Sequence, residues 1–183
     1  AGLIAMQSAI VSIESNLTSQ FVDLGANSIK VDDNVIQEAG QNDVPPITLD
    51  EARRCANHFL ELGFATSFHR RFKPNAKITF SSRSTNPNIS LIGGNLHYIP
   101  NNGYSLAYGR NFSEAESMYG SPSVILGSET ADVLGLGKDE LTSGSIVIDG
   151  LRVNVIGICA SRGNSQNSND RFVVLPASYL DQQ

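Results

Sequence analysis

The fold is decided by residues 145–159, which read SIVIDGLRVNVIGIC. Two aliphatic runs, at 145–149 and 152–159, flank the dipeptide Asp149-Gly150. Asp-Gly favours the tightest hairpin turns, because both central positions of such a turn need a positive φ angle. Short runs rich in Val and Ile are typical of strands that fill a core. The stretch therefore predicts an antiparallel β-hairpin that contributes to the core.

Other strands are predicted along the chain on either side of this hairpin. After Gly63 the hydrophobic pattern changes from the helical period to a period of two, which indicates strands. Turn-forming residues at 73–75 and 85–88 separate the first three of them. A polar loop at 161–169 precedes the last strand, which Pro176 ends. The remaining predicted strands cover residues 26–31, 64–72, 76–82, 89–92, 123–126 and 171–175.

Helices are predicted at three places, and the first has the clearest periodicity. In residues 1–24 the apolar side chains recur in steps of three and four, which places them in a narrow seam on one helix face. Such a seam needs a partner surface. A second helix begins at Thr48, which can form a capping box with Glu51, and ends at Gly63. A third helix covers residues 130–134. The seam of the first consists of Leu3, Met6, Ile10, Ile13, Leu17, Phe21 and Leu24.

Composition limits the class of protein. The chain has 183 residues, of which 40% are hydrophobic and 17% charged, and this is typical of a folded protein. A net charge of -5 argues against nucleic acid as the main partner, and the basic run at 69–73 is interpreted as the solvated side of a strand. No segment has the 18 or so apolar residues that span a bilayer. Because the sequence starts within a helical pattern and without a signal peptide, we expect it to be part of a longer protein.

The residues that commonly carry chemistry do not form a recognisable motif. The histidines at 58, 69 and 97 fall in a helix, a strand and a loop, without the spacing of metal ligands. Ser128 follows a strand, but the full Gly-x-Ser-x-Gly of a nucleophile elbow is absent, so Ser128 is interpreted as a helix N-cap. No glycine-rich phosphate loop is present. The sequence therefore predicts no catalytic, cofactor-binding or metal-binding residue.

The cysteines and the clustered tyrosines each allow two interpretations. Cys55 and Cys159 lie in apolar surroundings and are interpreted as buried thiols, with a single disulfide as the alternative in an oxidising compartment. Tyr98, Tyr104 and Tyr108 are interpreted as packing residues. Their alternative role is to stack on a small ligand.

Four stretches follow one another in a fixed order and spacing between residues 21 and 176. The second contains Gly94 and Tyr98 and continues through Leu106-Ala-Tyr-Gly109-Arg-Asn-Phe112. It is similar to the Gly-x-x-x-x-Tyr and Leu-x-x-Gly-Arg-x-Phe signature of MacB-type ABC-transporter permeases, and the four stretches together resemble the periplasmic core domain of that family. We expect the matched residues to be scaffold, with glycines where the backbone must be unrestricted. The stretches are residues 21–31, 94–116, 124–135 and 144–176.

The resemblance implies an α+β fold with two lobes and a stalk. Residues 1–24 would be the stalk helix that continues a transmembrane helix. Residues 25–92 would form a mixed α/β membrane-proximal lobe, and residues 93–183 an inserted, mainly antiparallel β lobe with a return strand. In the family, the segment corresponding to Leu175-Pro176 is followed by a further strand–helix–strand, so the membrane-proximal lobe is expected to be incomplete in this sequence.

The resemblance also implies a function, partners and a location. The chain would be the extracytoplasmic domain of a permease in the bacterial inner membrane, facing the periplasm, and not an enzyme. It would couple ATP hydrolysis by a cytoplasmic ATPase to export of a drug, peptide, lipoprotein or siderophore, or to signalling to a cell-wall hydrolase. Its partners would be that ATPase, a second permease copy, and a periplasmic adaptor with an outer-membrane channel. No cofactor is implied. A freestanding secreted ligand-binding module is the alternative from a different class.

Overall fold

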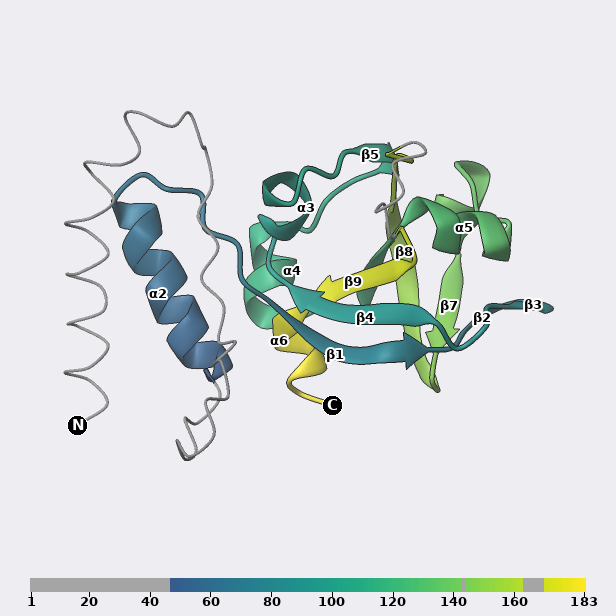
Figure 1. Cartoon of the computed structure of the whole chain (residues 1–183), viewed down its shortest axis with the longest axis horizontal. Helices are drawn as coiled ribbons and strands as arrows, with labels where there is room; N and C mark the ends of the chain where they lie inside the picture. Colours follow the sequence, from purple (N-terminus) through teal and green to yellow (C-terminus); the bar gives the residue numbers. More distant parts are fainter. Residues whose placement is uncertain (1–46, 143, 163–169) are drawn as a thin grey trace, which may run out of the picture. The chain divides into compact units, whose positions relative to one another are not determined.

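The chain divides into two units, Ala1–Pro46 and Ile47–Gln183, and the fold described below is that of the second unit. The predicted stalk helix at 1–24 and the predicted strand at 26–31 lie outside the described residues. The computed structural model (Figure 1) describes residues 47–142, 144–162 and 170–183.

The predicted hairpin is confirmed. Strand β7 (Ser145–Ile148) pairs antiparallel with β8 (Leu151–Cys159). The turn residues Asp149 and Gly150 have φ angles of 47° and 95°, as this kind of turn requires. The Asp149 carboxylate also accepts hydrogen bonds from the Lys73 side chain at 2.7 Å and from the Lys77 backbone N–H at 3.2 Å. The turn is therefore tied to residues that lie 76 and 72 positions away in the sequence.

Strand β8 occupies the centre of a mixed sheet, because three strands pair with it. Its first half pairs with β7 and its second half with β5, both antiparallel, while β6 pairs with it in parallel. Beyond β6 follow β9, β4 and β1, of which β4 and β9 are parallel to one another. The other strands are β1 (His69–Ala76), β2 (Ile78–Phe80), β3 (Arg83–Ser84), β4 (Ile89–Gly94), β5 (Leu106–Gly109), β6 (Ser123–Leu126) and β9 (Phe172–Pro176).

The sheet curls so that its two ends meet at Lys77. Strand β1 lies at one end of the strand order and the β2–β3 pair lies at the other. Nevertheless, Ala76 of β1 pairs with Ile89 while Ile78 of β2 pairs with Ile148, so one residue separates the two ends. Figure 1 shows β1 running directly into β2. A sheet joined in this way must curve around its inner face, as a barrel does.

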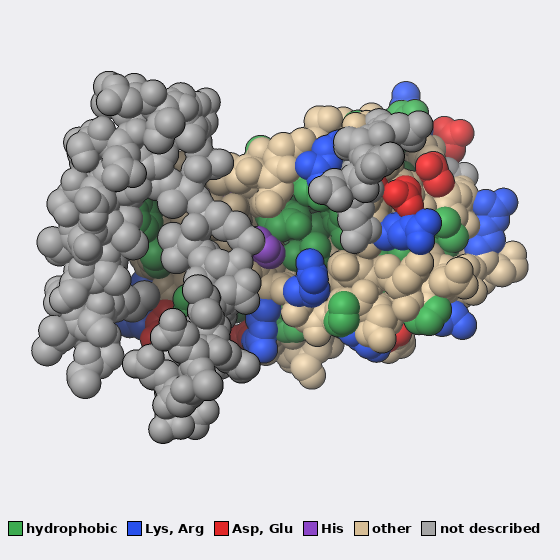
Figure 2. Space-filling model, in the orientation of Figure 1, with side chains coloured by type: hydrophobic (Ala, Val, Ile, Leu, Met, Phe, Trp, Pro, Cys, Tyr) green, Lys and Arg blue, Asp and Glu red, His purple; other side chains and the backbone are tan. Residues whose placement is uncertain are grey.

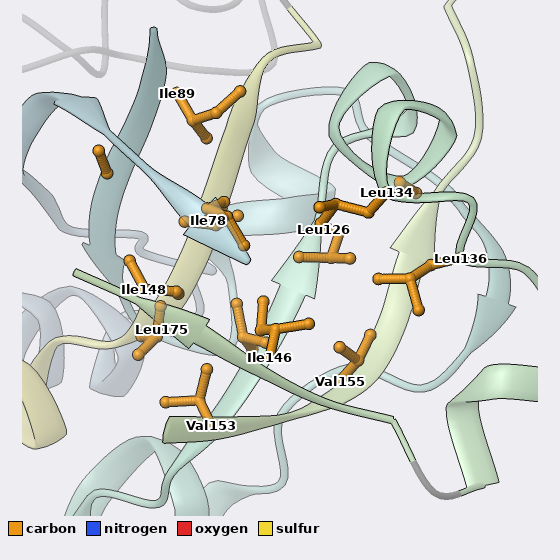
Figure 3. Packing of buried hydrophobic residues seen from close by; sticks show 14 of the residues in the cluster. Ile78, Ile89, Leu126, Leu134, Leu136, Ile146, Ile148, Val153, Val155 and Leu175 are labelled. Atoms are coloured by element: carbon orange, nitrogen blue, oxygen red, sulfur yellow. The ribbon is translucent and has the colours of Figure 1, made fainter. Parts of the chain in front are cut away.

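The curved sheet has one hydrophobic core on its inner face and a second on its outer face. Along β9, Val173 and Leu175 belong to the inner core, whereas Phe172 and Val174 belong to the outer core. This alternation follows from the two-residue period of a strand. The inner core (Figure 3) consists of Ala76, Ile78, Ile89, Val124, Leu126, Ala131, Leu134, Leu136, Ile146, Ile148, Val153, Val155, Ile158, Val173, Leu175 and Leu180.

The start of helix α2 and the end of helix α5 follow local sequence signals. Helix α2 (Leu49–Glu61) starts with a capping box: the Glu51 N–H donates to the Thr48 hydroxyl at 3.3 Å, and the Glu51 carboxylate accepts from the Thr48 N–H at 2.9 Å. Helix α5 (Ser128–Leu134) ends at Gly135, whose φ of 65° is left-handed. The others are α3 (Tyr98–Asn101), α4 (Glu114–Tyr119), the 3₁₀ turn η1 (Asp139–Thr142) and α6 (Ala177–Leu180).

The turn predicted at residues 73–75 is wrong, because β1 continues through it to Ala76. The pairing of β1 with β4 shifts register between Lys73 and Ala76. Pro74 lies within this irregularity, and a proline cannot donate a ladder hydrogen bond, so strands accommodate it at a bulge. The strand also begins at His69 and not at residue 64. A short proline-containing motif was therefore mistaken for a turn.

Candidate functional site

The three histidines come from three different elements of the fold. His58 is in α2, His69 begins β1, and His97 precedes α3. Among the described residues there is no group of three or more His, Cys, Asp or Glu side chains that could hold a metal ion. Within the same residues, no helix combines the length and the hydropathy needed to cross a bilayer.

Ser128 does not cap α5 with its side chain, so that prediction is wrong. The N-cap is Gly127, and the Ser128 hydroxyl donates to the Asp170 carboxylate at 2.9 Å. Both side chains are buried, and the Arg162 Nε atom lies 3.8 Å from the other oxygen of Asp170. The described contacts of Ser128 therefore tie α5 to the start of β9, an interaction between residues 42 positions apart.

The two cysteines are free thiols in this structure. Cys159 is buried in the outer core, and burial, followed by the neighbouring charge of Asp170, raises its pKa to about 12. Cys55 is half-buried, and burial also raises the pKa of its thiol. Since the thiolate is the reactive form of cysteine, neither position favours nucleophilic or redox chemistry.

Tyr98 and Tyr104 pack against the outer face of the sheet, which confirms packing for these two. Their rings stack with centroids 6.4 Å apart, and Tyr104 lies 4.7 Å from the ring of Phe172. The guanidinium carbon of Arg162 lies over the Tyr104 ring, 3.8 Å from its centre. Tyr108 is exposed on β5. The segment therefore offers no stack of free aromatic faces.

Basic side chains do not gather into a patch on the face that Figure 2 shows. Lys and Arg are spread over it and lie among Asp and Glu. Within the predicted basic run, Lys73 pairs with Asp149, and the guanidinium of Arg70 lies 5.2 Å from the ring centre of Phe72. This distribution does not resemble the concentrated positive surface that binds a phosphate backbone.

The signature segment, residues 106–112, connects β5 to β8 and to α4. Gly109 has a φ of 80°, and a Cβ placed on it would lie 2.2 Å from the carbonyl oxygen of Ile156. The next residue, Arg110, donates its backbone N–H to that carbonyl at 2.9 Å. Phe112 is buried in the outer core. The glycine thus allows the backbone of β5 to approach β8 closely, and Arg110 and Phe112 hold the two strands at this distance.

Arg110 makes a bidentate ion pair with Glu116. The two guanidinium nitrogens lie 2.6 and 2.9 Å from the carboxylate oxygens. Glu116 also accepts from the Ser113 N–H at 2.9 Å, which completes the capping box of α4. Hydrogen bonding to Arg110 is the largest cause of a lowered pKa of Glu116, about 2, with smaller contributions from Ser113. One carboxylate therefore joins the signature arginine to the helix that follows it.

We expect Glu116→Gln to destabilise the domain by about 1 to 2 kcal/mol at pH 7, after discounting for solvent around the half-exposed arginine. Because the folded-state pKa of Glu116 is lowered, the carboxylate stabilises the fold fully above its ordinary pKa of 4.5, and this stabilisation is lost as the pH falls toward about 2. Urea unfolding of both proteins between pH 7 and pH 2.5 should show the difference shrinking. A difference independent of pH, or an equal effect of Glu114→Gln, would contradict the role given to this ion pair.

These features define a class: an α+β scaffold in which the signature residues Gly109 and Arg110 connect neighbouring elements. A family model described as the MacB-like periplasmic core domain matches residues 1–183. The chain belongs to this family. It is thus an extracytoplasmic domain of the MacB type of ABC-transporter permease.

Solved structures show the same fold. The extracellular domain of the noncanonic ABC-type transporter YknZ from Gram-positive bacteria has a TM-score of 0.51 at 19% identity, over 64% of this chain and 55% of that chain. The periplasmic region of MacB from Actinobacillus actinomycetemcomitans has a TM-score of 0.57 at 14% identity, over 72% of this chain and 57% of that chain. The matches thus cover little more than half of those chains. No curated protein matches the sequence.

Proposed function

We propose that this domain couples ATP hydrolysis on the cytoplasmic side of a membrane to movement on the other side. The observation that carries the proposal is the combination of family membership with a curled sheet packed on both faces. A sheet with two cores resists deformation, since close-packed interiors transmit displacement. A domain built in this way is suited to move as a body. Its described thiols, by contrast, have the raised pKa values of unreactive groups.

The proposed setting is a permease in the bacterial inner membrane, with this domain in the periplasm. A separate ATPase subunit or domain would hydrolyse ATP, and a second permease copy would complete the transporter. Both structural neighbours are extracytoplasmic parts of ABC-type transporters, which supports this setting. We propose export of a drug, a peptide or a lipoprotein, with a periplasmic adaptor and an outer-membrane channel as further partners.

We further propose that residues 1–24 form a stalk, and that two lobes meet between residues 92 and 93. The stalk would connect the domain to the membrane. Strand β4 spans the boundary and pairs with β1 on one side and β9 on the other. Residues from both proposed lobes thus share one sheet, and displacement of either would reach the other through backbone hydrogen bonds.

Fractionation of cells that express the full-length protein tests this setting. We expect the protein to resist extraction from membranes by alkaline carbonate. We also expect protease added to spheroplasts to cleave the domain while the cytoplasmic ATPase stays intact. Recovery of the protein in the soluble periplasmic fraction would contradict the proposal and favour a freestanding binding module.

A further inference from the structure

Helix α2 ends in a rigid turn that its own last residues form. The N–H of Gly63 donates to the Leu60 carbonyl at 2.9 Å, and the N–H of Phe64 donates to the Phe59 carbonyl at 2.9 Å. This pair of bonds is a Schellman motif, in which the glycine adopts a positive φ, here 88°. The Phe64 ring then packs back on the Phe59 ring at 6.4 Å. Helix and turn therefore move as one body as far as Phe64.

Directly after this turn, two asparagines hold the chain against the sheet. The Asn101 side-chain amide donates to the Ala65 carbonyl at 2.8 Å. The Asn95 side-chain amide donates to the Thr66 carbonyl at 2.9 Å, and the Asn95 backbone N–H donates to the Phe68 carbonyl at 3.3 Å. We call this arrangement the asparagine clamp. It fixes the chain between the end of α2 and the beginning of β1.

Asn95 is a buried polar residue whose side-chain amide is only partly hydrogen-bonded. Only 7% of it is exposed, and its side-chain oxygen has no hydrogen-bond partner in the part of the chain that the structure describes. A buried amide with an unpaired oxygen destabilises a fold, so an apolar side chain would suit the position better if packing alone mattered. The donation from its NH₂ group to Thr66 is the interaction that an apolar side chain would lose.

A second connection between α2 and the sheet region is weaker. The Arg53 guanidinium donates to the Met118 carbonyl of α4 at 3.3 Å, and this bond is exposed. Exposed hydrogen bonds of this length contribute little, because water competes for both groups. The clamp is therefore the better-defined mechanical link among the described residues.

We propose that the asparagine clamp is the point at which displacement of α2 is passed to the sheet. This inference rests on the proposed function and adds a path to it. The rigid turn passes displacement of α2 to Phe64. The clamp bonds then hold the chain between Phe64 and β1, so that this segment moves together with the turn. Strand β1 pairs along its length with β4, which carries the displacement into the sheet.

Hydrogen exchange on the purified chain tests the clamp by itself. In the Asn95→Ala/Asn101→Ala variant, we expect the backbone amides at the start of β1, residues 69–71, to exchange about tenfold faster, because the loss of the two clamp bonds loosens the part of the strand that pairs with β4 there. Exchange in β6 should not change. The matched control is Asn102→Ala, which removes an amide–carbonyl bond to Tyr98 of 2.8 Å in the same loop without touching the clamp.

Wild-type exchange at residues 69–71 in the double variant would overturn the proposal. If the double variant exchanges faster throughout the domain, the single variant Asn101→Ala is measured in its place, because this residue is exposed and its replacement leaves the core intact. A local increase at residues 69–71 in that variant supports the clamp, and its absence overturns it.

Coupling is tested in the full-length permease assembled with its ATPase. Spin labels at Glu61→Cys report on α2, and labels at Asp132→Cys report on the sheet region, each measured between the two permease copies. With ATP and vanadate we expect both distances to change in the wild type. In the double clamp variant, only the α2 distance should change. Equal changes in wild type and variant would overturn the clamp and leave the proposed function standing, whereas no change at either site in the wild type would refute both.

Discussion

Gly109→Ala is expected to destabilise the domain by about 3 to 5 kcal/mol, a large part of the stability of an ordinary domain. Two causes act together at this position. The φ of 80° is unfavourable for any residue with a Cβ. The new Cβ would also meet the Ile156 carbonyl oxygen at 2.2 Å, so β5 would have to move away from β8. That movement would break the bond between the Arg110 N–H and the same carbonyl.

Gly103→Ala is the matched control for this prediction. Gly103 has a φ of 71°, but no atom lies within 4 Å of the position that its Cβ would take. The control therefore keeps the conformational strain and omits the clash, and it should destabilise the domain by about 1 kcal/mol. Urea unfolding followed by circular dichroism measures both values. Equal losses at the two positions would show that the close approach of β5 to β8 is unimportant.

Leu126→Ala is expected to destabilise the domain by about 3 to 5 kcal/mol. Leu126 is fully buried in the inner core, on a strand that pairs with both β8 and β9. Its truncation leaves a cavity inside the curled sheet, and the walls of the cavity are strands that cannot collapse without breaking their ladders.

Val133→Ala provides the contrast for the core prediction. Val133 lies on α5 with 54% of its surface exposed, so we expect a change below about 0.5 kcal/mol. Thermal unfolding of both variants against the wild type measures the difference. A loss for Leu126→Ala no larger than that for Val133→Ala would mean that the sheet does not enclose a packed core.

Local chemistry explains the parts of the fold that the sequence predicts well. The turn at Asp149-Gly150, the capping box at Thr48 and the left-handed end at Gly135 each depend on a few neighbouring residues. The signature residues around Gly109 were likewise expected to be scaffold, and their contacts are of that kind.

Other features depend on residues that are distant in sequence, and no local pattern reveals them. The curling of the sheet follows from the pairing of Ala76 and Ile78 with opposite ends of it. The role of Ser128 depends on Asp170, which lies beyond a polar loop. Gly127 is one of the glycines in the matched stretches, where the sequence predicts an unrestricted backbone. Its φ is an ordinary -67°, and it is glycine-specific because a Cβ would lie 2.2 Å from the Asp170 carbonyl oxygen.

The function was predicted from resemblance and not from a site. The residues that usually indicate a reaction, such as His58 or Cys159, are dispersed or buried in the described fold. The coupling that we propose would depend on contacts between distant residues, such as that of Asn95 with Thr66, and a sequence does not reveal these contacts.

We propose that this domain moves when ATP is hydrolysed on the other side of the membrane. The most direct measurement is the distance between spin labels at Asp132→Cys in the two copies of the full-length permease, assembled with its ATPase in a lipid bilayer. We predict that the distance distribution differs between the nucleotide-free complex and the complex trapped with ATP and vanadate. Identical distributions in a complex that hydrolyses ATP would show that the domain does not move with hydrolysis.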